Sequence, residues 1–151
     1  MSAEFDFLTA DDRPALLGVS SSEVADNAKA ALEQMGYKVH SAANHGEFLH
    51  KFGQAPYQVV VIEENFCAET VEENESLQSL GRMGMNLRRQ AVVVLVGPSF
   101  ATFNPLQAFQ QGVHSVVNPS ELFLLSQLIQ KAIADNEMFL HTYRNGQRRL
   151  G

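Results

Sequence analysis

The chain lacks several features that would place it in a specialised class of protein. Its 151 residues include a single cysteine, Cys67, so no internal disulfide can form and nothing in the sequence requires an oxidising compartment. Basic residues are few, with 11 Lys and Arg against 17 Asp and Glu, and the resulting net charge of −6 disfavours phosphate backbones and anionic membranes. The longest apolar runs, such as 92–96, have the length of strands and are too short to cross a bilayer. We therefore expect no nucleic-acid and no membrane partner.

The N-terminal residues 1–13 are acidic and lack the basic and apolar regions of a signal peptide, which predicts a cytoplasmic protein. Hydrophobic residues make up 45% of the chain and charged residues 19%, as expected for one folded domain of this size. We find no repeat and no internal linker. The sequence therefore predicts an N-terminal tail at 1–13, one domain at 14–143 and a C-terminal tail at 144–151.

Five apolar runs alternate with helical patterns along the domain. The runs predict strands at 15–19, 37–41, 59–62, 91–96 and 113–117. The third and fourth runs are apolar on both faces, as in the centre of a parallel sheet. The helices are expected after Ser20–Ser22 (ending at Gly36), after Asn44, over 69–82, from Asn104 to Gly112 and over 120–143. This order predicts an α/β fold with three layers, a doubly wound, five-stranded parallel sheet, for which the flavodoxin-like order 2-1-3-4-5 is one of two common solutions.

Four segments carry a resemblance to a known family. They are EVADNAKAALEQMGYKVHSA, AANHGEFLHKF, PYQVVVIEE and QQGVHSVVNP, in that order along the chain. Together they resemble the first helix and second strand, the second helix, the third strand and the fifth strand of a receiver domain. The stretch from about 14 to 134 is thus similar to the receiver domains of response regulators in two-component signal transduction, which implies the receiver-like strand order.

The resemblance also implies a phosphorylation site, from which this sequence departs. Receivers hold Mg²⁺ with an acidic pair and a phosphoacceptor aspartate, because this hard cation prefers oxygen ligands. A lysine and a Ser or Thr then bind the phosphoryl group. Here the acidic pair falls on Val19 and Ser20, or on Ser20 and Ser21. The remaining positions fall on Glu63 (phosphoacceptor), Val96 or Gly97 (hydroxyl), Asn118 (lysine) and Ser115 (aromatic switch). The chain therefore resembles a pseudo-receiver, a degenerate member that has lost phosphorylation.

Two interpretations of Glu63 follow, a permanent negative charge that mimics phosphorylation or a simple solvated carboxylate at a strand end. We favour the second, and we interpret the acidic stretch from Glu63 to Glu75 as a solvated helix face. Cys67 has no neighbouring base in the sequence, and the five histidines show no metal-ligand spacing and are expected as surface or capping residues. We therefore expect no catalytic residue, no metal and no cofactor.

The final predicted helix is longer than a five-stranded sheet needs, and its far end holds Phe139 and Tyr143 among other large apolar residues. Exposed apolar residues at helical spacing indicate a contact with another helix. We expect these two residues to form a homodimer interface. The alternative is that Phe5, Phe7 and Leu8 of the N-terminal tail cover the same surface.

The sequence thus predicts a module for phosphorylation-independent signalling or scaffolding, which acts by binding a protein partner in a bacterial-type cytoplasm. The alternative is a small-ligand sensor, with its ligand in the crevice near Ser20, Glu63 and Gly97. A ligand sensor requires that crevice to be hollow and lined with polar groups, whereas an interaction module leaves it filled. An enzyme on this fold ranks last, because no nucleophile, base and orienting group can be named together.

Overall fold

The computed structural model describes residues 13–83 and 91–150, with side chains described as far as residue 138 in the last helix. Five parallel strands form one sheet: β1 (Arg13–Gly18), β2 (Tyr37–Ser41), β3 (Val59–Glu63), β4 (Val92–Val96) and β5 (Ser115–Val117). Their order is β2-β1-β3-β4-β5. The predicted doubly wound α/β fold and its flavodoxin-like order are therefore confirmed.

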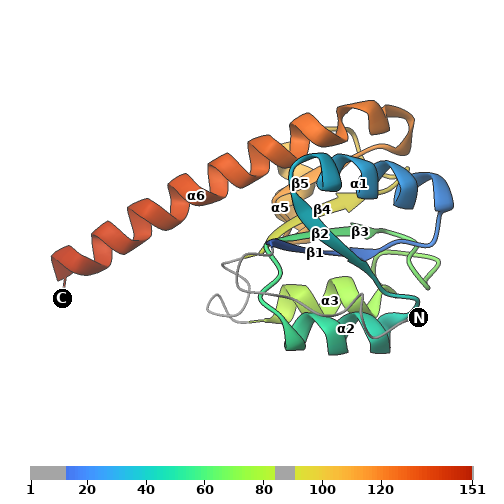
Figure 1. The fold of residues 1–151 in the computed structure, drawn as a ribbon, viewed down its shortest axis with the longest axis horizontal. Coiled ribbons are helices and arrows are strands. Elements are labelled where there is room, and N and C mark those ends of the chain that lie inside the picture. Colours follow the sequence, from blue (N-terminus) through green and yellow to red (C-terminus); the bar gives the residue numbers. More distant parts are fainter. Residues whose placement is uncertain (1–12, 84–90, 151) are drawn as a thin grey trace.

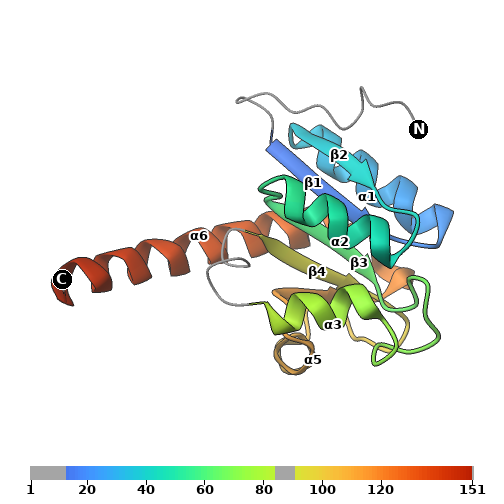
Figure 2. The ribbon, with the colours of Figure 1, turned by 90° about the horizontal axis from the view of Figure 1, so that it is seen from below.

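Helices cover both faces of the sheet (Figures 1 and 2). On one face lie α1 (Ser22–Gln34) and α6 (Leu125–Leu150), which contact each other. On the other lie α2 (His45–Gln54), α3 (Glu75–Arg82) and α5 (Pro105–Gln111). A 3₁₀ helix, η2 (Pro119–Leu124), joins β5 to α6. Among the described helices none is long and apolar enough to cross a membrane.

The sheet divides the core into two apolar layers because side chains alternate along each strand. Leu17, Val61 and Val94 face α1 and α6, whereas Leu16, Val60 and Val93 face the opposite helices. All residues of β3 and β4 are buried, as the apolar runs 59–62 and 92–96 predicted, and the burial extends to Glu63 at the end of β3. The side chains of β3 and β4 are thus taken up by the core, and parallel α/β folds usually bind their ligands at the carboxyl ends of such strands.

Local signals set most of the helix ends. The side chains of Asn44 and Asn104 accept hydrogen bonds from the third residue beyond them, Glu47 and Gln107 respectively, and so cap α2 and α5. Gly112 ends α5 in the left-handed region with φ of 68°, which a glycine adopts without strain. The predicted cap at Asn104, the stop at Gly112 and the start of a helix after Asn44 are confirmed.

Three predicted boundaries need correction. Helix α3 begins at Glu75 instead of 69, because Asn74 provides its N-cap and the preceding residues form turns. Strand β5 is limited to Ser115–Val117, although its apolar run begins earlier. The final helical segment opens with the 3₁₀ turn η2, and α6 then continues for 26 residues to Leu150, well beyond the sheet (Figure 1).

Candidate functional site

The carboxyl ends of β1, β3 and β4 meet at one edge of the sheet, because these three strands are neighbours and all run parallel. We call this place the crevice. It is bordered by the loop from β1 to α1 with Ser20 and Ser21, by Glu63 and Glu64 at the end of β3, and by the loop after β4 with Gly97 and Ser99. The crevice lies where parallel α/β folds usually bind ligands.

Glu63 fills the first part of the crevice. Its carboxylate Oε1 accepts hydrogen bonds from the backbone N–H of Ser20 at 2.9 Å and of Ser21 at 3.0 Å. Ser21 is the N-cap residue of α1 but makes no side-chain cap bond, so a carboxylate from β3 takes over part of that task. The negative charge is also favourable near the N-terminus of a helix. Glu63 is 5% exposed, so its interpretation as a solvated strand-end carboxylate is wrong.

Glu64 fills the second part of the crevice. Its Oε1 accepts the Ser99 N–H at 2.8 Å, and its Oε2 accepts the Ser99 hydroxyl at 2.9 Å. The side chain passes directly in front of Gly97, where a Cβ would overlap its carboxylate. Sequence reasoning did not single out Glu64, and it treated the acidic stretch from Glu63 onward as a solvated face. That interpretation fails for Glu63 and Glu64, which are both buried.

Asn74 binds the main chain of both glutamates. Its side chain is fully buried, and its Nδ2 donates to the main-chain carbonyls of Glu63 at 2.9 Å and Glu64 at 3.3 Å. Its Oδ1 accepts the N–H of Leu77 at 3.0 Å and so caps α3. One amide group therefore ties the end of β3 to the start of α3, which sets the direction in which the two carboxylates leave the strand.

Asn118 and Val96, the other two residues of the predicted degenerate phosphorylation site, have structural contacts. The Asn118 Nδ2 donates to the carbonyl of Phe100 at 2.9 Å, and its Oδ1 accepts the N–H of Ser120 at 3.0 Å. Asn118 thereby joins the end of β5 to the loop after β4. Val96 is fully buried in β4, and its carbonyl accepts the N–H of Glu64 at 2.8 Å.

Cys67 and His45 lie close to the crevice without forming a reactive pair. The His45 Nδ1 accepts the N–H of Ser76 at 3.1 Å, so the hydrogen of the ring is on Nε2, which donates to the Cys67 carbonyl at 3.2 Å. The exposed thiol of Cys67 instead contacts the Ala43 carbonyl at 3.4 Å. The histidine thus meets the backbone of Cys67 and not its sulfur, and it connects α2 with α3.

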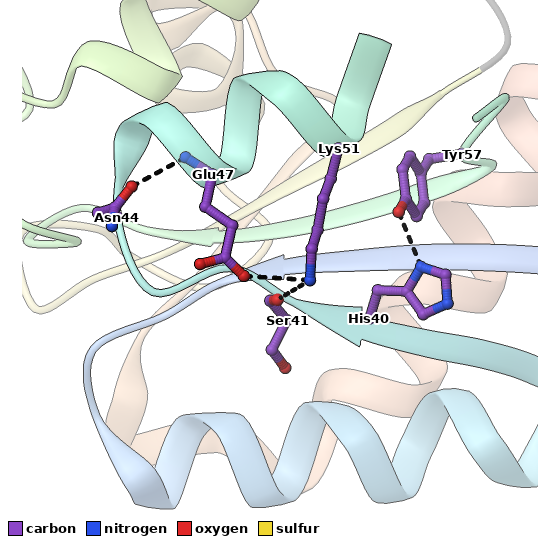
Figure 3. A network of polar contacts seen from close by, with 6 residues as sticks. All are labelled: His40, Ser41, Asn44, Glu47, Lys51 and Tyr57. Carbon is purple, nitrogen blue, oxygen red and sulfur yellow. Dashed lines mark hydrogen bonds and ion pairs between the residues drawn. The ribbon is translucent and has the colours of Figure 1, made fainter. Parts of the chain in front are cut away.

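A second polar network lies between β2 and α2 (Figure 3). Lys51 is 8% exposed, and its ammonium donates to the Ser41 carbonyl at 2.8 Å and pairs with Glu47 at 3.1 Å. Nearby, the Nδ1 of His40 and the hydroxyl of Tyr57 are 2.8 Å apart. His40 is buried, so its expectation as a surface or capping residue is wrong. Through Lys51, which binds both Ser41 and Glu47, the network joins α2 to the end of β2.

The side chains at the crevice do not fit a magnesium site. Mg²⁺ requires several oxygen ligands in octahedral geometry. The loop after β1 offers Ser20 and Ser21, and the carboxylates of Glu63 and Glu64 already accept main-chain N–H groups. In the described part of the chain, no three His, Cys, Asp or Glu residues cluster as metal ligands would. This filling favours an interaction module over the predicted alternative of a ligand sensor.

Comparison with known proteins places the fold. No protein-family model matches the chain, and no curated protein matches it. Among solved structures, the chemotaxis response regulator CheY4 of Vibrio cholerae is 17% identical with a TM-score of 0.60, over 80% of this chain and 98% of that one. A CheY-like receiver domain protein from Methanospirillum hungatei is 19% identical with a TM-score of 0.61, over 85% and 98%.

The signal receiver domain of a LuxO repressor protein from Vibrio parahaemolyticus is 11% identical with a TM-score of 0.64, over 87% of this chain and 97% of that one. The match covers almost the full length of each of these neighbours. At such low identities the likeness concerns the fold alone. The receiver fold expected from the sequence resemblance is therefore confirmed.

Proposed function

We propose that this chain, with its receiver fold, is a signalling or scaffolding module that acts through protein–protein contact in a bacterial-type cytoplasm and is not phosphorylated. One observation carries the proposal: the carboxylates of Glu63 and Glu64 already bind the loops after β1 and β4. A receiver needs an open site there for a cation and a phosphoryl group. In this chain the same loops are bound by carboxylates of the chain itself.

The position of Glu64 refines the idea of a charge mimic. In receivers, the resemblance implies, a Ser or Thr after the fourth strand binds the phosphoryl oxygens. Here Ser99 follows β4 and gives both its N–H and its hydroxyl to the carboxylate of Glu64. We assign the permanent charge that holds this loop to Glu64, whereas Glu63 holds the start of α1. Such a module presents one surface continuously, as a scaffold requires.

The direct test is whether the residues of the crevice can be phosphorylated. After incubation with acetyl phosphate and Mg²⁺, we expect the intact mass of the protein to stay unchanged, because Glu64 binds Ser99 through both of its oxygens and the described residues around Glu63 offer no cluster of metal-ligating side chains. A receiver domain that retains its aspartate serves as the positive control under the same conditions. A stable phosphoryl adduct on Glu63 or Glu64, located by fragmentation, would refute the pseudo-receiver proposal.

The far end of α6 is our candidate surface for the protein partner. The helix extends past the sheet, and Met138, the last residue whose side chain is described, is 71% exposed there. Phe139 and Tyr143 follow, and their side chains lie outside the described residues, as do Phe5, Phe7 and Leu8 of the alternative covering tail. A projecting helix with large apolar residues is suited to packing against another protein.

We expect the double substitution of Phe139 and Tyr143 by Glu to remove a specific protein from the set that the wild type retains in an affinity pull-down from its native host. Two charges on a helix face that packs against a partner would leave those charges without water. Phe123→Glu is the matched control, because Phe123 is 76% exposed on η2. If the double variant retains the same proteins as the control, the far end of α6 is not the partner surface.

A further inference from the structure

A groove of about 410 Å³ lies between the end of α1 and α6, and we call it the α1–α6 groove. Arg13 and Tyr37, which begin the parallel strands β1 and β2, are among the residues that line it. The groove is therefore at the amino ends of the strands, whereas the crevice is at their carboxyl ends. Its volume lies within the range of sites that bind small molecules.

Arg13 is held in a defined position at the α1–α6 groove. Its guanidinium lies over the ring of Tyr37, with its Cζ 4.6 Å from the ring centroid. The same guanidinium donates to the main-chain carbonyl of Met35 at the end of α1. Gly36 leaves room for it, since a Cβ at that residue would stand only 2.9 Å from a guanidinium nitrogen. These contacts use one face and one N–H group, whereas a guanidinium has five N–H donors.

Glu137 brings the opposite charge to the same groove from α6, where it is exposed. Burial raises the pKa of Tyr37, while the charge of Arg13 lowers it and the charge of Glu137 raises it. Both charges therefore act on the hydroxyl of one tyrosine. Within the described part of the chain, Arg13 and Glu137 form no ion pair with each other or with a third residue. Each can still pair with a charge on a ligand.

Apolar side chains form another part of the α1–α6 groove. Met35 and Ile133 pack against the core with one side and are half-buried, so their remaining surface is turned to the groove. Ala134 adds a small apolar residue from α6. Apolar surface beside two unpaired charges of opposite sign suits a small molecule that has an apolar part and carries both charges.

We propose that the α1–α6 groove binds a free α-amino acid with an apolar side chain. The carboxylate of the ligand pairs with the planar fork of Arg13, and its ammonium pairs with Glu137. Its side chain lies against Met35 and Ile133. An amino acid carries both charges on one carbon and is neutral as a whole. The net charge of −6 therefore does not repel it, whereas it repels a simple organic anion.

The site proposed here is independent of the proposed function, which rests on the crevice. An amino acid in the α1–α6 groove leaves Glu63 and Glu64 with their present partners, so the acetyl phosphate test stands whether or not the ligand binds. Conversely, a phosphoryl adduct at the crevice would leave Arg13 and Glu137 unchanged. The two proposals can fail separately.

Titration of the ¹⁵N-labelled full chain with phenylalanine, followed by NMR, tests the site. We expect saturable shifts of the amide signals of Met35, Tyr37 and Ile133, with a Kd on the order of 0.1–1 mM for so small a ligand. 3-Phenylpropionate lacks the ammonium and phenethylamine lacks the carboxylate, so each should bind at least about tenfold more weakly. Serine, which lacks the apolar side chain, should also bind more weakly than phenylalanine.

Variants assign the two charges of the ligand. Glu137→Gln should remove the advantage of phenylalanine over 3-phenylpropionate, because no carboxylate is left for the ammonium. Arg13→Gln should remove its advantage over phenethylamine. Asp135→Asn on α6 and Lys29→Gln on α1 are the matched controls, which make the same changes of charge outside the groove and should bind phenylalanine like the wild type. Circular dichroism verifies that each variant is folded.

Three results overturn the proposal. The first is a wild type whose signals do not shift with phenylalanine up to about 10 mM. The second is a set of shifts at Gly97 and Ser99, since the ligand then binds at the crevice and not in the α1–α6 groove. The third is an equal affinity of the wild type for phenylalanine and 3-phenylpropionate, since Glu137 then takes no part in binding.

Discussion

Gly97→Ala is expected to lower the free energy of unfolding by about 2–4 kcal/mol, a large effect for one methyl group. The backbone of Gly97 is not in the left-handed region, so the residue is not required for its conformational freedom. It is required because the carboxylate of Glu64 occupies the space where a Cβ would stand. The methyl group would displace that carboxylate and leave a buried charge without its two bonds to Ser99.

A double-mutant cycle identifies the cause. In a Glu64→Ala background the space in front of Gly97 is free, so Gly97→Ala should there cost less than about 1 kcal/mol. Gly53→Ala is the control of opposite sign: nothing lies near a Cβ at that position in α2, and alanine should stabilise the helix by up to about 1 kcal/mol. Chemical denaturation measures all four variants. Equal costs of Gly97→Ala in both backgrounds would show that Glu64 does not fill the crevice.

The fold could be predicted because its signals are local. Uniformly apolar runs identified β3 and β4, and Asn104 and Gly112 marked the two ends of α5. The boundary errors arose where a signal depends on packing. The acidic residues before Glu75 favour a helix by composition. The helix α3 nevertheless begins only after Asn74, because the side-chain amide of Asn74 donates to the carbonyls of Glu63 and Glu64 and so holds this residue at the end of β3.

The candidate site could be located but not described from the sequence. Strand ends placed Glu63 and Ser20 at one edge of the sheet, since neighbouring parallel strands end together. The partners of a side chain, however, depend on which loops the sheet brings within a few ångströms. Glu64 meets Ser99 across 35 positions of sequence, and no spacing rule indicates that contact. The only hint was Gly97, a residue without a side chain after a strand of large ones.

Asn74→Asp is expected to destabilise the protein by about 2–4 kcal/mol, although the substitution is isosteric. The cap bond to the N–H of Leu77 survives, because a carboxylate accepts it equally well. The two bonds from Nδ2 do not survive, since a carboxylate has no hydrogen to donate to the carbonyls of Glu63 and Glu64. The new oxygen would face two carbonyl oxygens at a position that is fully buried.

Asn44→Asp is the control for this loss of two buried hydrogen bonds, because Asn44 also caps a helix but has no such bonds to lose among those described. Asn44 caps α2 through the N–H of Glu47 and is exposed, so the same change there should alter stability by no more than about 0.5 kcal/mol.

The pKa of the carboxyl introduced at position 74 should be raised by burial, and its protonated form can donate again. The deficit of Asn74→Asp should therefore shrink as the pH falls and be largest at neutral pH. Denaturation curves of both variants at acid and neutral pH measure this difference, and equal deficits at positions 74 and 44 would mean that Asn74 serves only as a helix cap.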